Sequence, residues 1–117
     1  KMDKKYVNDG IQLLVNSTEI GLNEFTSSFL KDTIEGMVSS LKTDVGPLYE
    51  ATIEIANIEP ENMENAVIEL FINDVSIEIN EFVSGIMKES VYGMVKALNT
   101  EKFGIETIKS INIKIEK

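Results

Sequence analysis

The residues best able to do chemistry in this chain are carboxylates that recur at matching positions of two similar segments. Glu24 matches Glu81, and Asp32 matches Glu89. Paired carboxylates can bind Mg²⁺ or Ca²⁺, or act in acid–base catalysis. The interpretation we favour is simpler: Glu24 and Glu81 are first-turn acids of two helices, and Asp32 and Glu89 lie on solvated helix faces. The ligand spacing of a calcium loop does not accompany them.

Several residue types that catalysis often uses are absent from the sequence. The chain has no His and no Cys, and all 11 of its basic residues are Lys. His is the commonest general base, Cys supplies thiolate chemistry, and Arg binds phosphate or carboxylate through two hydrogen bonds. Ser27 and Ser84 recur, but no partner able to activate them is evident. The sequence therefore predicts a protein that is not an enzyme, with no catalytic residue, no cofactor-binding residue and no metal ligand.

The charge of the chain restricts its partners. The formal net charge is −9, and the lysines are scattered along the sequence. Nucleic acids and anionic membrane surfaces repel such a protein, so we expect no nucleic-acid and no membrane partner. No apolar run approaches the length of a membrane-spanning helix, and no signal peptide is visible. We expect a cytoplasmic protein whose partner is another protein or a further copy of itself.

An internal repeat organises the sequence. Residues 20–43 align with residues 77–100 without a gap, and 11 of the 24 positions are identical. Unrelated segments of ordinary composition would share about one or two. The match extends more weakly on both sides. The chain is predicted to be a single domain, 1–117, with internal repeats at approximately 6–58 and 63–117.

Each repeat unit has the pattern of two strands, a helix and a third strand. Apolar residues alternate with a period of two in residues 11–15 and 68–72, which predicts strands with one buried face. Short polar links and second strands at 20–22 and 77–79 follow. Asn23 and Asn80 are suitable N-caps for helices with apolar residues three and four apart, and a final alternating strand closes each unit.

These elements predict an α+β fold. Two tandem ββαβ units would form one pseudo-twofold-symmetric domain, with the helices packed on an antiparallel or mixed sheet. Such a domain corresponds to a symmetric dimer joined into one chain.

Gly36 and Gly93 occupy matching positions inside the predicted helices. A glycine inside a helix costs about 1 kcal/mol relative to alanine, so a compensating reason is expected at both positions. We favour close packing, with both glycines where the two helices cross. On this interpretation, leucine at both positions destabilises the fold strongly. The alternative is a ligand that lies against the bare backbone.

One asymmetry between the repeats suggests a surface. Tyr92 stands where the first repeat has Glu35, and Phe71 falls on the outward face of its strand. Together, Phe71 and Tyr92 are a candidate interaction surface.

The helix region resembles a group of small uncharacterised archaeal proteins, of the kind found in methanogens. The resemblance is carried by Leu22-Asn23-Glu24-Phe25 and the following Gly36-Met37-Val38, and by their counterparts in the second repeat. The resemblance implies an archaeal source and a dimer-like fold, and it supplies no catalytic residue. Thr43 and Thr100 stand where the similar proteins often have glycine, so the helix exits are expected to differ.

The functional hypothesis from the sequence is a non-enzymatic protein-interaction or scaffold module. The alternative is a small-molecule or divalent-metal binding protein, with a site at the pseudo-dyad lined by the duplicated acids. An enzyme that uses carboxylate or lysine chemistry is the least favoured hypothesis.

Overall fold

The fold is α+β, with a six-stranded antiparallel sheet and two helices. The structure is a computed structural model, and it describes residues 10–41 and 43–117. The predicted first repeat therefore extends, at residues 6–9, outside the described part. The elements in chain order are β1 (Ile11–Val15), β2 (Thr18–Glu19), α1 (Glu24–Ser39), β3 (Glu50–Ala56), the short 3₁₀ helix η1 (Met63–Asn65), β4 (Val67–Ile72), β5 (Val75–Ile77), α2 (Glu81–Lys96), the 3₁₀ helix η2 (Thr100–Phe103) and β6 (Ile111–Glu116).

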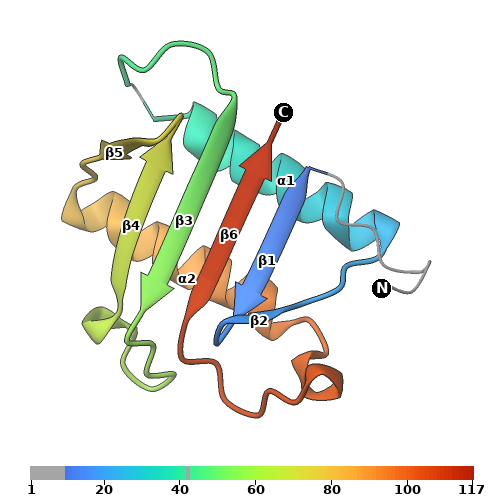
Figure 1. Ribbon diagram of the computed structural model, residues 1–117. Helices are drawn as coiled ribbons and strands as arrows, with labels where there is room; N and C mark the ends of the chain where they lie inside the picture. Colours follow the sequence, from blue (N-terminus) through green and yellow to red (C-terminus); the bar gives the residue numbers. More distant parts are fainter. Residues whose placement is uncertain (1–9, 42) are drawn as a thin grey trace.

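The strands lie in the order β2-β1-β6-β3-β4-β5. Both helices cover the same face of the sheet and leave the other face uncovered (Figure 1). The central pair is β3 and β6, in which Ile53 lies opposite Ile113. β6 also pairs with β1, and β3 also pairs with β4. β3 therefore lies between two strands from the second half of the sequence, and β6 lies between two strands from the first half.

Two tight hairpins build the edges of the sheet. Asn16 and Ser17 connect β1 to β2 with φ angles of 52° and 67°, and Asn73 and Asp74 connect β4 to β5 with φ angles of 51° and 66°. Two successive residues with positive φ are the signature of the type I′ turn, which asparagine tolerates. The hairpins were predicted, but their second strands were placed too late: β2 and β5 begin directly after the turns and end before or at the start of the predicted residues 20–22 and 77–79.

The helices begin where the sequence predicts. The side-chain oxygen of Asn23 accepts a hydrogen bond from the Thr26 amide, and that of Asn80 accepts one from the Val83 amide, both at 2.8 Å. Each bond satisfies one of the free amide groups at a helix N-terminus.

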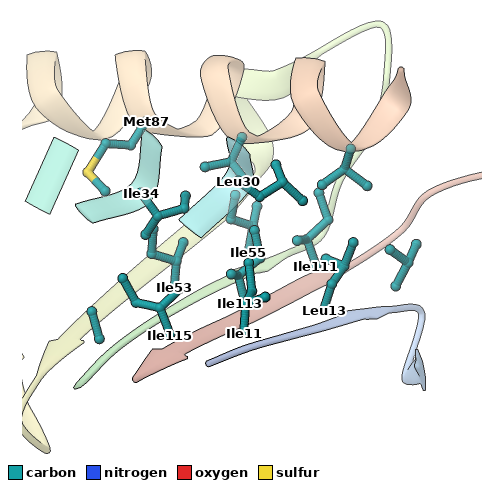
Figure 2. Close-up of a cluster of buried hydrophobic side chains, with 14 of the residues drawn as sticks. Ile11, Leu13, Leu30, Ile34, Ile53, Ile55, Met87, Ile111, Ile113 and Ile115 are labelled. Carbon is teal, nitrogen blue, oxygen red and sulfur yellow. The ribbon is translucent and has the colours of Figure 1, made fainter. Parts of the chain in front are cut away.

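The core lies between the helices and the sheet. Alternate strand residues point towards the helices, and Leu30, Ile34 and Met87 point back towards the sheet (Figure 2). Ile53 and Ile113, in the middle of the sheet, are fully buried. Because the strand side chains alternate, the other face carries mainly polar residues such as Glu54 and Asn112, which are hydrogen-bonded to each other at 3.3 Å.

Candidate interaction surface

The two helices carry large apolar side chains on the side that faces away from the sheet. On α1, Leu30, Ile34 and Val38 are buried against the sheet. Phe25 and Phe29 are 77% and 51% exposed, and their rings stack with centroids 6.0 Å apart. At 3.6 residues per turn, these two phenylalanines lie opposite the buried residues. The helix thus has a second, solvent-facing apolar surface.

The same arrangement occurs on α2. Met87, Val91 and Val95 are buried, whereas Phe82 and Ile86 are 75% and 49% exposed. Phe82 matches Phe25 in the repeat, and Ile86 matches Phe29. We call Phe25, Phe29, Phe82 and Ile86 the outward apolar residues.

The sequence carries a signal for this surface in the spacing of its helix residues. Apolar residues three and four apart predict one broad stripe on each helix. The separation between Phe25 or Phe29 and the buried Ile34 places them on different sides of α1, so the pattern contains two stripes and not one.

A groove with a volume of about 880 Å³ adjoins the outward apolar residues of α2. Met63 and Glu64 of η1 form one side, and Phe82, Gly85 and Ile86 form part of the other. The remaining lining residues are Glu81, Lys88, Glu89 and Ser90. We call it the α2 groove.

Lys88 fixes the position of η1 beside α2. Its ammonium group donates hydrogen bonds to the carbonyl oxygens of Ala66, at 2.9 Å, and Glu64, at 3.5 Å. The lysine charge is therefore directed at the backbone carbonyls on the η1 side of the groove.

Gly36 and Gly93 do not lie at a helix crossing. Both are exposed, and a Cβ atom built at either position has no described atom within 4 Å. The close-packing interpretation is wrong within this chain, because both glycines lie on the outward side of their helices. Gly36 shares that side with Phe29, and Gly93 shares it with Ile86.

Phe71 and Tyr92 do not form one surface. Phe71 is half-buried on the uncovered face of the sheet, where it pairs with Thr52. Tyr92 lies on α2, on the opposite face, and packs against the core. Its ring lies 5.9 Å from the Lys96 ammonium group. The sheet separates the two aromatic residues.

The duplicated acids are not brought together either. Glu24 and Glu81 begin their helices at opposite ends of the helical layer (Figure 1). Within residues 10–41 and 43–117, no group of three or more His, Cys, Asp or Glu side chains could hold a metal ion. Two of the acids, Glu81 and Glu89, instead line the α2 groove together with Glu64.

The comparisons do not assign a family. Neither protein-family models, curated proteins nor solved structures gave a match to this chain. The resemblance to small archaeal proteins stays a prediction from the helix motif alone. In the described part of the chain, neither helix has the length and apolar character needed to cross a membrane.

Proposed function

We propose that this protein is a non-enzymatic protein-interaction module whose contact surface is formed by the outward apolar residues of α1 and α2. The main observation in support of this proposal is the exposure of Phe25, Phe29, Phe82 and Ile86 on the helix sides opposite the core. Surface apolar residues that occur singly need no explanation, but a matched pair of large apolar residues on each of the two helices supports a binding role.

Burial of the outward apolar residues would supply part of the free energy of binding. Covering about 100 Å² on each of the four side chains contributes roughly 2.5 kcal/mol per side chain at 25 cal/mol per Å². The cost of association, about 4–15 kcal/mol, is comparable with the sum over all four side chains, so a stable complex also needs contacts around them.

The proposed architecture is a duplicated ββαβ unit with a pseudo-twofold axis between β3 and β6. The strand order supports it, because matching β1 with β4, β2 with β5 and β3 with β6 reproduces the same order from the other edge. The burial pattern also supports it, because β3 and β6 alternate in the same way along Ala51–Ile55 and Ile111–Ile115.

This architecture changes one detail of the repeat alignment. In the sequence, the weaker match that follows residues 20–43 and 77–100 aligns Ile53 and Ile55 with Ile111 and Ile113. The pairing register of the strands moves this alignment by two residues, so that Ile53 corresponds to Ile113. The axis then passes between Ile53 and Ile113, since these two residues are paired with each other.

Such symmetry suggests a scaffold with two contact regions. The first is formed by Phe25 and Phe29, and the second by Phe82 and Ile86. Both regions face away from the sheet, because both helices cover the same face of it (Figure 1). The regions are separated, because the N-terminal ends of α1 and α2 lie at opposite ends of the helical layer. A module of this kind can hold two partner segments on one side of the molecule.

The test is a capture experiment with matched variants. The wild-type protein, a variant with serine at all four outward apolar positions, and a control variant with Phe71→Ser and Val67→Ser are each immobilised. Each is incubated with lysate of the source organism, and the bound proteins are identified by mass spectrometry.

We expect a stoichiometric partner on the wild type and on the control, and its loss on the variant that lacks the outward apolar residues. Circular dichroism checks that all three proteins are folded. A partner that binds all three equally, or no partner on any of them, would contradict the proposal.

A further inference from the structure

The charge around the α2 groove is mainly negative, with three carboxylates and one lysine on its lining. Glu64, Glu81 and Glu89 are exposed carboxylates on its lining. Lys88, the lysine of the groove, directs its ammonium group to the Ala66 and Glu64 carbonyl oxygens. Phe82, Ile86 and Met63 supply apolar surface between the acids. An apolar surface flanked by carboxylates complements an apolar segment that carries positive charge.

The same charges disfavour two other occupants. A phosphate, a nucleic acid or another anion would meet three carboxylates. A second copy of this chain also carries a net charge of −9, so self-association through the acidic groove brings like charges together. A basic segment of a different protein is the occupant that the charges favour.

The shape of the groove favours a peptide segment over a small molecule. A site for a small molecule is a concave pocket that buries most of the surface of its ligand. Here Phe82 is 75% exposed and Ile86 is 49% exposed, so the groove runs open along the surface of the helix. An elongated ligand can cover this surface without being enclosed.

Two glycines on α2 allow a partner to approach the helix backbone closely. A Cβ built at Gly85, in the groove, or at Gly93, farther along the outward side, meets no described atom within 4 Å. Each glycine costs the helix about 1 kcal/mol relative to alanine, and no close packing within the described chain accounts for that cost. Bare backbone on the outward side lets a partner helix approach closely.

We propose that the α2 groove binds a basic amphipathic helix of a partner protein. Apolar residues one turn apart on that helix pack against Phe82, Ile86 and Met63, and lysine or arginine residues on its flanks face the carboxylates of the groove. This inference rests on the proposed interaction function and adds the class of partner segment and the site that receives it.

The experiment uses two designed helical peptides of about 16 residues, the length of α2. Both carry the same leucine stripe, and the polar positions are lysine in one peptide and glutamate in the other. Binding to the full chain is measured by fluorescence anisotropy at about 20 mM and about 200 mM salt. We expect saturable binding of the lysine peptide, weaker at the higher salt concentration, and at least about tenfold weaker binding of the glutamate peptide.

Matched variants separate the groove from the general negative charge. Glu64→Gln with Glu89→Gln removes two charges from the groove, and Glu69→Gln with Glu116→Gln removes two exposed charges from elsewhere in the molecule. We expect the groove variant to bind the lysine peptide about tenfold more weakly than the wild type does. The control variant should bind it less than about twofold more weakly. If both variants lose the same affinity, the peptide is attracted only by the net charge of the protein, and the inference is overturned.

Gly85→Gln tests close approach without loss of the fold. Glutamine forms helices better than glycine, so this variant is expected to melt at a higher temperature while it binds the lysine peptide at least about fivefold more weakly. Gly36→Gln is the control on α1: it is expected to gain similar stability and to bind the peptide like the wild type. Unchanged affinity of Gly85→Gln would contradict contact at this position.

The outcomes also separate this inference from the function on which it rests. If both peptides bind equally and Phe82→Ser with Ile86→Ser weakens both, the apolar interaction surface stands and the basic partner is wrong. If neither peptide binds at concentrations up to about 1 mM, the groove does not bind basic amphipathic helices. The capture experiment then decides the proposed function independently.

Discussion

Asn16 and Asn73 make equivalent hydrogen bonds to the chain at the starts of the two central strands, β6 and β3. The side-chain oxygen of Asn16 accepts from the amides of Lys109 and Ser110, at 2.7 and 3.0 Å. That of Asn73 accepts from the amides of Tyr49 and Glu50, at 2.8 and 3.1 Å. Each asparagine thus ties a hairpin turn to the start of a strand that is distant in the sequence.

Replacing Asn73 by alanine should destabilise the protein by about 2–4 kcal/mol, because the hydrogen bonds and the tolerance of positive φ are both lost. Asn73→Asp keeps the acceptor oxygen and the turn conformation but loses the donor bonds to the carbonyl groups of Val45 and Pro47. It also places a carboxylate oxygen against these two carbonyl groups, so it should still cost about 1–3 kcal/mol. Urea unfolding measures the free energy of unfolding of both variants. A loss below about 0.5 kcal/mol for the alanine variant would show that the bonds to Tyr49 and Glu50 do not stabilise the fold.

The exposed glycines lead to a prediction opposite to that from the sequence alone. Gly36→Ala and Gly93→Ala should each raise the free energy of unfolding by up to about 1 kcal/mol, because the added methyl group meets open space and alanine forms helices better. Thermal unfolding of the single and double variants checks this. A destabilised double variant would restore the close-packing interpretation.

Neighbouring residues of α1 should differ sharply in their contribution to stability. Leu30 is 1% exposed and Phe29 is 51% exposed. Leu30→Ala should cost about 2–5 kcal/mol through the cavity it leaves, and Phe29→Ala should cost less than about 1 kcal/mol. Chemical denaturation of the two variants measures the contrast. Similar losses would mean that Phe29 belongs to the core and is not available to a partner.

Much of this fold could be predicted from local patterns. The N-caps Asn23 and Asn80, the alternating core residues of β1 and β6, and the polar hairpin turns follow from hydrogen-bonding and periodicity rules that act over a few residues. These rules are local, so they hold whatever the tertiary arrangement is.

The outward apolar residues could not be predicted from local patterns, because their exposure depends on the tertiary structure. Phe25 and Leu30 are both apolar and lie on the same helix, but only Leu30 faces the sheet. The extent to which the sheet covers each helix decides which apolar residues are buried, and helical spacing alone does not give that extent. The strand order likewise depends on which strands pair over long distances, and residue patterns do not specify it.

The halves of the chain should not fold alone as monomers. β1 and β3 are both adjacent to β6, so a fragment containing residues 1–60 leaves a vacant place between them. We expect this fragment to be unfolded or to self-associate, and we expect it to form a folded complex when mixed with residues 61–117. Size-exclusion chromatography and circular dichroism measure this. A cooperatively unfolding monomeric fragment would contradict the interlocked arrangement.

The central position of β6 has a consequence for the newly made chain. β6 is the last of the six strands to leave the ribosome, yet both β1 and β3 need it as a neighbour. Until it emerges, two strands keep unpaired edges that can associate with other chains. We expect β6 to insert between them late in folding, and a pause in translation before residue 111 to prolong the interval in which the nascent protein is prone to aggregate.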